Sequence, residues 1–449
     1  MAGARLGAGE ALGDDGGVSD AYLALALVGA LAVLVTFWPI RRDPLSVVCF
    51  VAGWLAGELP LQALAVMVVV TVVFGVFGAF DTWTGRAGLA VAAAVACGLV
   101  VLAVIGARSA NVVAQALADA TGPLDVDPAL PSPAPGRWWR LTRAVPVRAR
   151  SIAVVADVDY WGDGLERHRL DIYRADGPVG TGAPVMVYVH GGAWTIGDKK
   201  EQGKPMLFEL VARGWVCVAV NYRLSPSATW PDHIVDVKRA VAWVKANIAE
   251  HGGDPAFVAL SGGSAGGHLC ALAALTPDDR SWQPGFEDAD TSVDACVPFY
   301  GVYDMTASPT TSGLYGPELA KLLERKVMKT SIEEHHDLFV EASPTYRVAA
   351  GAPPFFVLHG RNDTLVPFIV ARRFVEALRQ TSQAAVAYAE LPVAQHAFDV
   401  LSSLRCQATT AGVVAFLEAV REAAGDRAGP APPGAGVVVP PGGSAVAEA

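Results

Sequence analysis

The chain has 449 residues, of which 52% are hydrophobic and only 17% charged, and its formal net charge is −10 at pH 7. Soluble domains carry about 25% charged residues, so the composition predicts a part embedded in a membrane. The negative charge argues against nucleic acid as a partner, because no large basic stripe offsets it. Six cysteines stand without a C-x-x-C pair, which favours buried thiols over disulfides or a metal site.

The first 117 residues contain long apolar runs without a charge. Each of three runs has the length of about 20 residues that a membrane-spanning helix needs. These runs cover residues 21–40, 61–80 and 87–106. We expect a transmembrane helical region over residues 21–117, preceded by a disordered tail over residues 1–20. The first run lacks a basic stretch before it, which favours a retained helix over a signal peptide.

A shorter apolar run, residues 45–59, lies between the first two long ones. It is too short to cross a bilayer alone and is interrupted by Glu58, so we expect a re-entrant segment. Glu58 fits two roles, a functional acid inside the membrane or a turn residue at the interface, and the pattern favours the second.

Arginines set the expected orientation of this multi-pass membrane region. Arg41, Arg42 and Arg108 follow the first and third runs, whereas the N-terminal tail is acidic. With three spans, the positive-inside rule places the large C-terminal part in the cytoplasm. If the short segment also crosses, four spans place that part outside.

Two further segments have the composition of connectors. Residues 118–150 are expected to form a linker with an interfacial stretch, Arg137-Trp138-Trp139-Arg140, for which an ordinary solvated helix is the alternative. Residues 425–449 consist largely of alanine, glycine, proline and valine without periodicity and are expected to be a disordered tail.

From residue 151 to residue 424 the pattern changes to short β-branched runs that alternate with helical stretches. This alternation predicts an α/β fold, with an eight-stranded, mostly parallel sheet and helices on both faces. The expected strands are 154–161, 170–174, 185–190, 216–222, 257–260, 295–300, 355–359 and 386–391, the first two antiparallel. The expected helices are 204–213, 233–251, 264–275, 367–380 and 397–423, with a small helical insertion over 304–343.

A G-x-S-x-G motif, residues 262–266, stands between the fifth strand and the helix that follows it. A serine at such a strand-to-helix turn is exposed on a sharp bend, as in the nucleophile elbow of an α/β-hydrolase. The motif predicts Ser264 as a nucleophile. By itself it is weak evidence in a chain with 46 glycines.

A serine nucleophile needs a general base, and the base needs an acid that orients it. In this fold the chain order is serine, acid, histidine, and only His396 follows the last strand. Asp363 lies just past the seventh strand, where the acid is expected. Asp399 is set aside because, on a helix three residues after His396, it would point elsewhere. The predicted catalytic triad is Ser264, Asp363 and His396.

A His-Gly-Gly-Ala-Trp stretch, residues 190–194, follows the third strand. Backbone N–H groups of such a loop form an oxyanion hole together with the residue after the nucleophile. The sequence therefore predicts an oxyanion hole from Gly191, Gly192, Ala193 and Ala265. Trp194 and Tyr222 fit either the lining of an acyl pocket or the core.

His190-Gly-Gly-Ala-Trp194, Asn221-Tyr-Arg-Leu224 and Gly262-Gly-Ser-Ala-Gly-Gly-His268 together resemble the hormone-sensitive-lipase-like and feruloyl-esterase-like α/β-hydrolases. With its apolar N-terminal region, the chain is similar to the membrane-anchored Lip-type esterases of actinobacteria. That family is thought to cleave acyl esters of short to medium chain length.

The interpretation is a membrane-anchored serine carboxylesterase or lipase that hydrolyses acyl esters through an acyl-enzyme. Its expected partners are a small-molecule or lipid-derived ester and the lipid bilayer, and no metal or organic cofactor is expected. An amidase or formamidase of the same fold is the first alternative, because the machinery does not distinguish an ester from an activated amide. A membrane interaction protein without enzymatic activity is the second.

Overall fold

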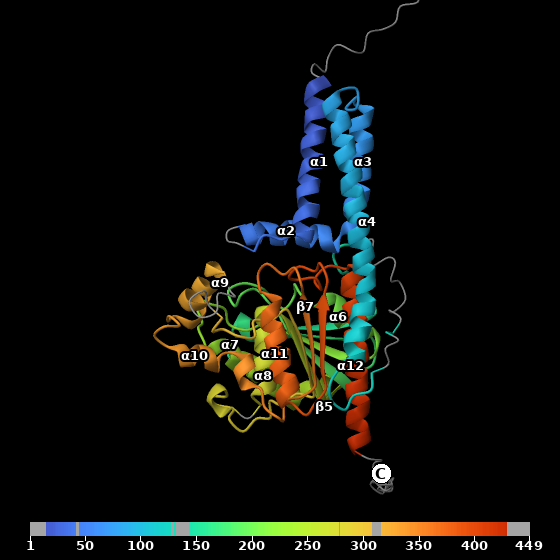
Figure 1. The fold of residues 1–449 in the computed structure, drawn as a ribbon. Helices are drawn as coiled ribbons and strands as arrows, with labels where there is room; N and C mark the ends of the chain where they lie inside the picture. The colour runs from blue at the N-terminus through green and yellow to red at the C-terminus, as the bar shows by residue number, and fades with distance from the viewer. Residues whose placement is uncertain are drawn as a thin grey trace, which may run out of the picture.

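The computed structural model describes residues 15–41, 45–126, 130–131, 143–277, 279–307 and 316–428. Long helices form a bundle that stands on an α/β domain, and one short helix, α2, lies across the boundary between them (Figure 1). The predicted interfacial stretch around Trp138 and most of the expected C-terminal tail lie outside the described residues.

The N-terminal region consists of four helices: α1 (Asp15–Phe37), α2 (Leu45–Glu58), α3 (Pro60–Val76) and α4 (Trp83–Ala118). Helices α1 and α4 are long and apolar enough to cross a membrane, and a third span results if α2 and α3, bent by 89° at their junction, count as one. The three-span topology therefore remains a prediction. The short run expected to be re-entrant corresponds to α2.

Helix α4 connects the two parts of the molecule. At 1.5 Å per residue its 36 residues extend about 54 Å, far more than the ~30 Å hydrocarbon core of a bilayer. Its first part exposes apolar side chains as far as Val104, and Arg108 follows four residues later. Beyond Arg108, Val113 and Leu117 are buried against the α/β domain. The first part of α4 thus belongs to the helical bundle, and its last turns pack against the α/β domain.

The α/β domain contains the eight-stranded sheet that the sequence predicts. Its strands lie in the order β1-β2-β4-β3-β5-β6-β7-β8, with β2 antiparallel to both β1 and β4 and all other pairs parallel. The strands are β1 (Ile152–Asp159), β2 (Arg169–Ala175), β3 (Ala183–Val189), β4 (Val216–Val220), β5 (Gly253–Gly263), β6 (Ala295–Phe299), β7 (Phe355–Gly360) and β8 (Val386–Leu391). The predicted α/β-hydrolase fold is confirmed.

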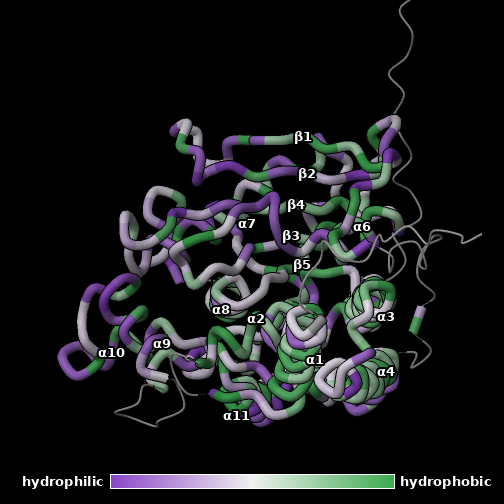
Figure 2. Tube along the Cα trace, turned by 90° about the horizontal axis from the view of Figure 1, so that it is seen from above, coloured by the Kyte–Doolittle hydropathy of each residue, from purple (hydrophilic) through white to green (hydrophobic). Residues whose placement is uncertain are grey.

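Both faces of the sheet are covered because strand side chains alternate between them. On β3, Val185 and Val187 belong to one core cluster, and Met186 and Tyr188 to the other. The first cluster is closed by α7 (Asp232–Asn247), α8 (Ala265–Leu275) and α11 (Phe368–Thr381), the second by α6 (Lys204–Ala212), α12 (Leu404–Ala428) and the end of α4. Viewed from above, the predominantly hydrophobic tubes of α1 and α4 lie on the side of β5 that is away from β1 and β2 (Figure 2).

Short helices complete the domain. They are η1 (Glu166–His168), η2 (Ile248–His251), η3 (Arg280–Trp282), α9 (Pro317–Leu322), η4 (Leu323–Met328), α10 (His336–Glu341) and η5 (Pro344–Arg347). Helices α9, η4 and α10 fall in the predicted helical insertion, of which residues 308–315 are outside the described part.

The expected start of the last helix at Ala397 is wrong. Ala397 has a positive φ of 60°, outside the helical region, and α12 begins only at Leu404. The Ser403 hydroxyl accepts the N–H of Cys406 at 2.9 Å and thereby satisfies one of the free amides at the helix start. The histidine loop after β8 is consequently longer than predicted, and Asp399 lies in it rather than on a helix.

Candidate active site

Ser264 occupies the turn between β5 and α8 in a backbone conformation that side chains rarely adopt. Its φ is +56° and its ψ −119°. The turn is possible because its neighbours have no side chain: a Cβ at Gly262 would lie 2.6 Å from the carbonyl oxygen of Val189, and one at Gly266 only 2.0 Å from it. The G-x-S-x-G spacing is therefore explained by contact with β3, and Ser264 is held in the geometry of a nucleophile elbow.

Asp363 and His396 meet at the same edge of the sheet. Asp363 follows β7 and His396 follows β8, and the distance from Asp363 Oδ2 to His396 Nδ1 is 2.6 Å. The other carboxylate oxygen accepts the N–H groups of Leu365 and Val366, each at 2.8 Å. Because Nδ1 faces the carboxylate, Nε2 is the ring nitrogen left to exchange a proton.

Asp363 is fully buried yet ionised. Burial alone raises the pKa of a carboxyl, but the imidazole of His396 and the hydrogen bond from His359 outweigh it, and the pKa of Asp363 lies well below its ordinary value. His359 Nε2 lies 3.2 Å from Asp363 Oδ2 and 2.9 Å from the carbonyl oxygen of Val366. From the sequence, His359 is expected only to order a loop, so its contact with Asp363 is a finding of the structure.

Tyr300 directly follows β6 and lies beside both His396 and the residue before Ser264. Its ring centroid is 4.4 Å from that of His396, and a Cβ at Gly263 would lie 2.7 Å from its hydroxyl oxygen. The hydroxyl donates to Asp399. Within the described residues no hydrogen bond joins the Ser264 hydroxyl to His396, although both residues follow strands of the same sheet, β5 and β8. Such bonds are often long in the absence of substrate.

The His-Gly-Gly-Ala-Trp loop presents free amides beside the elbow. Gly192 and Ala193 both have positive φ, +119° and +51°, and their N–H groups have no partner among the described residues. Ala265 is the first residue of α8, where backbone amides lack an intrahelical acceptor. The N–H of Gly191 instead donates to Gln202 Oε1 at 2.8 Å, which leaves three of the four predicted groups available.

The remaining buried histidines near the edge are held neutral. Burial lowers the pKa of both His190 and His268 to about 4. His190 Nδ1 bonds the carbonyl of Gly191, and its ring stacks on Tyr222 at 4.5 Å, so it fixes the glycine loop. Trp194 and Tyr222 are 1% and 0% exposed, which makes them core aromatics.

The end of α1 docks on the loop that carries Asp363, a contact that the sequence did not reveal. Asn362 Nδ2 donates to the carbonyl oxygen of Thr36 at 2.7 Å. Arg41 donates to the carbonyl of Arg361 at 2.9 Å. These partners are more than 300 residues apart in the chain, so no local pattern links them.

Helix α2 docks on both the Asp363 loop and the His396 loop. Thr364, next to Asp363, donates its hydroxyl to the carbonyl of Ser46 at 2.9 Å. Trp54 Nε1 donates to the carbonyl of Ala397, next to His396, at 2.9 Å. The ring of Phe50 meets that of His396 edge-on, with centroids 6.2 Å apart. The N-terminal helical region therefore contacts the candidate site directly.

Glu58, at the end of α2, forms a buried ion pair with Arg405 of α12 and accepts the Ser403 hydroxyl at 2.7 Å. It thus stands at a bend, as the sequence suggested, and also anchors that bend to the α/β domain.

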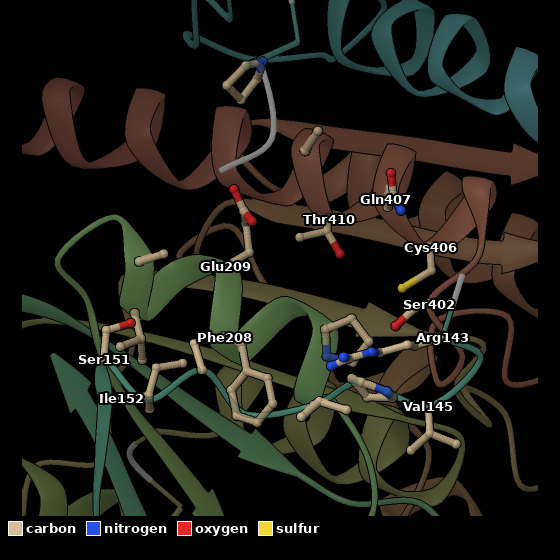
Figure 3. Close-up of a pocket in the computed structure, with 18 of the residues that line it drawn as sticks. Arg143, Val145, Ser151, Ile152, Phe208, Glu209, Ser402, Cys406, Gln407 and Thr410 are labelled. Carbon is tan, nitrogen blue, oxygen red and sulfur yellow. The ribbon is translucent and has the colours of Figure 1, made fainter. Parts of the chain in front are cut away.

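A cavity of about 490 Å³ lies elsewhere, on the face of the sheet covered by α6 and α12. Phe208 and Glu209 on α6 face Gln407 and Thr410 on α12 across it (Figure 3). None of Ser264, Asp363 and His396 lines this cavity. It is separate from the site at the carboxyl edge of the sheet.

Sheet order, elbow and the acid–base pair define this part of the chain as an α/β-hydrolase. Residues 170–378 match the model of the BD-FAE family. The probable carboxylic ester hydrolase LipM of Mycobacterium tuberculosis is 53% identical over 285 residues, which are 63% of this chain and 65% of LipM. The esterase LipQ of the same organism is 48% identical over 60% of this chain and 63% of its own length.

Among solved structures, a truncated carbohydrate esterase from gut microbiota superimposes with a TM-score of 0.52 at 24% identity, covering 61% of this chain and 99% of that one. This likeness concerns the fold. The predicted resemblance to feruloyl-esterase-like hydrolases and to Lip-type esterases is confirmed. The chain spans slightly less than two thirds of the length of either Lip relative.

Proposed function

We propose that the protein is a membrane-anchored serine carboxylesterase. The observation that carries the proposal is the hydrogen bond between Asp363 and His396 at the sheet edge where Ser264 stands on a strained elbow. The names of LipM and LipQ, a probable carboxylic ester hydrolase and an esterase, support the ester as the bond that is cleaved.

In the proposed mechanism, Ser264 Oγ attacks the carbonyl carbon of the ester while His396 Nε2 takes the hydroxyl proton. Asp363 holds the ring by its Nδ1–H and stabilises the imidazolium that forms. When the tetrahedral intermediate collapses, the alcohol leaves with the proton from His396, and the acyl group stays on Ser264. A water molecule then attacks the acyl-enzyme along the same path and releases the acid.

The developing negative charge on the carbonyl oxygen needs donors that are already in place. The N–H groups of Gly192, Ala193 and Ala265 are proposed to form this oxyanion hole, since the amide of Gly191 is engaged by Gln202. In other serine hydrolases, removal of one such donor costs about 3–4 kcal/mol of transition-state stabilisation.

The anchor is proposed to consist of α1, α3 and α4, with the α/β domain in the cytoplasm. Arg41 bonds Arg361 of the α/β domain, and Arg108 follows the exposed apolar part of α4; the far end of the bundle, at the starts of α1 and α4, carries Asp20 and Asp81 and a single described arginine, Arg86. This distribution follows the positive-inside rule. An impermeant fluorophosphonate probe should therefore label the protein in permeabilised cells and not in intact ones.

The chemistry is tested with the full chain in detergent micelles and p-nitrophenyl butyrate as substrate. Ser264→Ala should lower kcat by roughly 10⁵-fold and abolish labelling by a fluorophosphonate. Ser261→Ala, three residues earlier on β5, is the matched control and should stay within a few-fold of the parent. Full activity in Ser264→Ala would rule the mechanism out.

A further inference from the structure

Helix α2 has one face on the loops of Asp363 and His396 and another whose side chains are about half exposed. The contact face carries Phe50, Trp54 and Gly53; a Cβ at Gly53 would lie 3.4 Å from the Gln395 side chain, next to His396. Residues of this face recur at three- to four-residue spacing, as expected for one side of a helix. The helix is thus a wall of the site.

The adjoining face of α2 is apolar and exposed. Its side chains are Val47, Val48, Val51 and Leu55, which are between 45% and 64% exposed; Glu58, which follows them at the end of the helix, is buried. A contiguous apolar surface of this kind on a described part of the chain marks a contact with a partner or a membrane.

The position of α2 along the bundle indicates that its apolar face contacts a membrane and not a protein partner. Its carboxyl end, at Gly57 and Glu58, lies around one small cavity with Gly106 of α4. Arg108 follows two residues later and ends the exposed apolar part of α4. Helices α2 and α3 are bent by 89° at their junction, so α2 lies across the bundle. It lies at the level where the exposed apolar part of the bundle ends (Figure 1). A helix in that plane with an apolar outer face lies in the interface of a bilayer.

We propose that α2 is seated in the bilayer leaflet next to the α/β domain and forms the membrane-facing wall of the active site. The substrate class that follows is a long-chain acyl ester that resides in this leaflet. Its carbonyl reaches Ser264 past Phe50 while its acyl chain remains among the lipids. This inference rests on the proposed function, since it concerns the ester that the same site hydrolyses.

The first test compares two esters on the full chain reconstituted in phosphatidylcholine vesicles. One ester is dioleoylglycerol within the vesicle, the other soluble p-nitrophenyl butyrate. Val48→Asp should lower the ratio of the two rates at least ten-fold, because a charge on the outer face of α2 lifts it from the leaflet. Val179→Asp, at a position 48% exposed and remote from α2, is the matched control and should leave the ratio unchanged.

A second measurement is independent of catalysis. A bimane fluorophore on Val48→Cys, in a Cys97→Ala background because Cys97 is the exposed cysteine of the described chain, should be quenched by brominated lipids. The same label on Val179→Cys should not be quenched. Equal quenching at both positions, or an unchanged rate ratio in Val48→Asp, would overturn the assignment of α2. Absence of butyrate hydrolysis in the parent would instead overturn the proposed function.

Discussion

The two halves of the candidate site are supported in different ways. The elbow of Ser264 and the glycine loop are fixed by the α/β domain itself, through close backbone contact between β3 and the start of α8. The loops of Asp363 and His396 also rest on that domain, but they are additionally bonded to α1 and α2. The Ser264 half is held by contacts within the α/β domain, whereas the half with Asp363 and His396 also depends on contacts with the N-terminal helices.

This difference has a functional consequence. Changes in the elbow should act on folding of the domain and on catalysis together, because the turn is part of the packed core. Changes in the docking contacts should act on the placement of the acid and the base while the elbow stays intact. Substitutions in the elbow and in the docking contacts therefore distinguish these two kinds of effect.

The largest effect on stability is expected for Gly266→Ala in the elbow. Alanine is intrinsically favoured over glycine in a helix by about 1 kcal/mol. Here its Cβ would lie 2.0 Å from the carbonyl oxygen of Val189, a backbone atom that cannot move without disturbing β3. We expect a loss of about 4 kcal/mol or more in the free energy of unfolding and at least a 100-fold lower kcat. Thermal unfolding measures the loss of stability, and hydrolysis of p-nitrophenyl butyrate measures the change in kcat. Gly351→Ala, with open space around its Cβ, is the control; equal stability of the two variants would refute the packing argument.

A smaller loss is expected for Glu58→Gln between α2 and α12. The Glu58 and Arg405 side chains are each 1% exposed, so the substitution leaves a buried guanidinium without its counter-charge. Removal of one partner of a buried ion pair costs about 3–5 kcal/mol. The double variant Glu58→Met with Arg405→Met should recover most of this loss, because both charges are then absent. Unfolding in detergent, followed by circular dichroism, distinguishes the cases. A double variant as unstable as the single one would show that the charge is not the cause.

The sequence predicts candidate residues in both halves of the site, but by different signals. The G-x-S-x-G turn and the His-Gly-Gly loop are short motifs whose geometry depends on glycine, and their positions after the fifth and third strands support each other. Asp363 and His396 follow from chain order. The docking of Thr36, Ser46 and Trp54 on these loops could not be foreseen, because hydrogen bonds to distant carbonyl groups leave no local pattern. The loop containing Asp399 was mistaken for helix because its composition suits one, whereas Ala397 adopts a positive φ.

A third prediction concerns Asp399 and pH. Burial raises its pKa from 3.8 to about 6, although the hydroxyl of Tyr300 partly opposes this shift. Because the folded-state pKa is raised, the carboxylate destabilises the fold as the pH rises from about 4 to 6, and the destabilisation is complete above pH 6. Asp399→Asn should therefore raise the free energy of unfolding by on the order of 2 kcal/mol at pH 8 and by little at pH 4. Tyr300→Phe should act in the opposite direction at pH 8. Equal gains of Asp399→Asn at both pH values would contradict the assignment.

The smallest effect is expected for Trp54→Phe, which removes one hydrogen bond from the docked half. The indole N–H donates to the carbonyl of Ala397, and a neutral bond of this kind contributes about 1 kcal/mol. Phenylalanine keeps an aromatic ring beside Phe50, so the packing of α2 should persist. If Trp54 positions the His396 loop, kcat for butyrate should fall three- to ten-fold with KM nearly unchanged. Trp83→Phe, at a position 77% exposed at the far end of the bundle, should leave both constants as they are. A rise in KM alone would mean that Trp54 contacts the substrate and does not orient His396. The two halves of the site would then differ in how they bind the substrate, and not in how their catalytic groups are positioned.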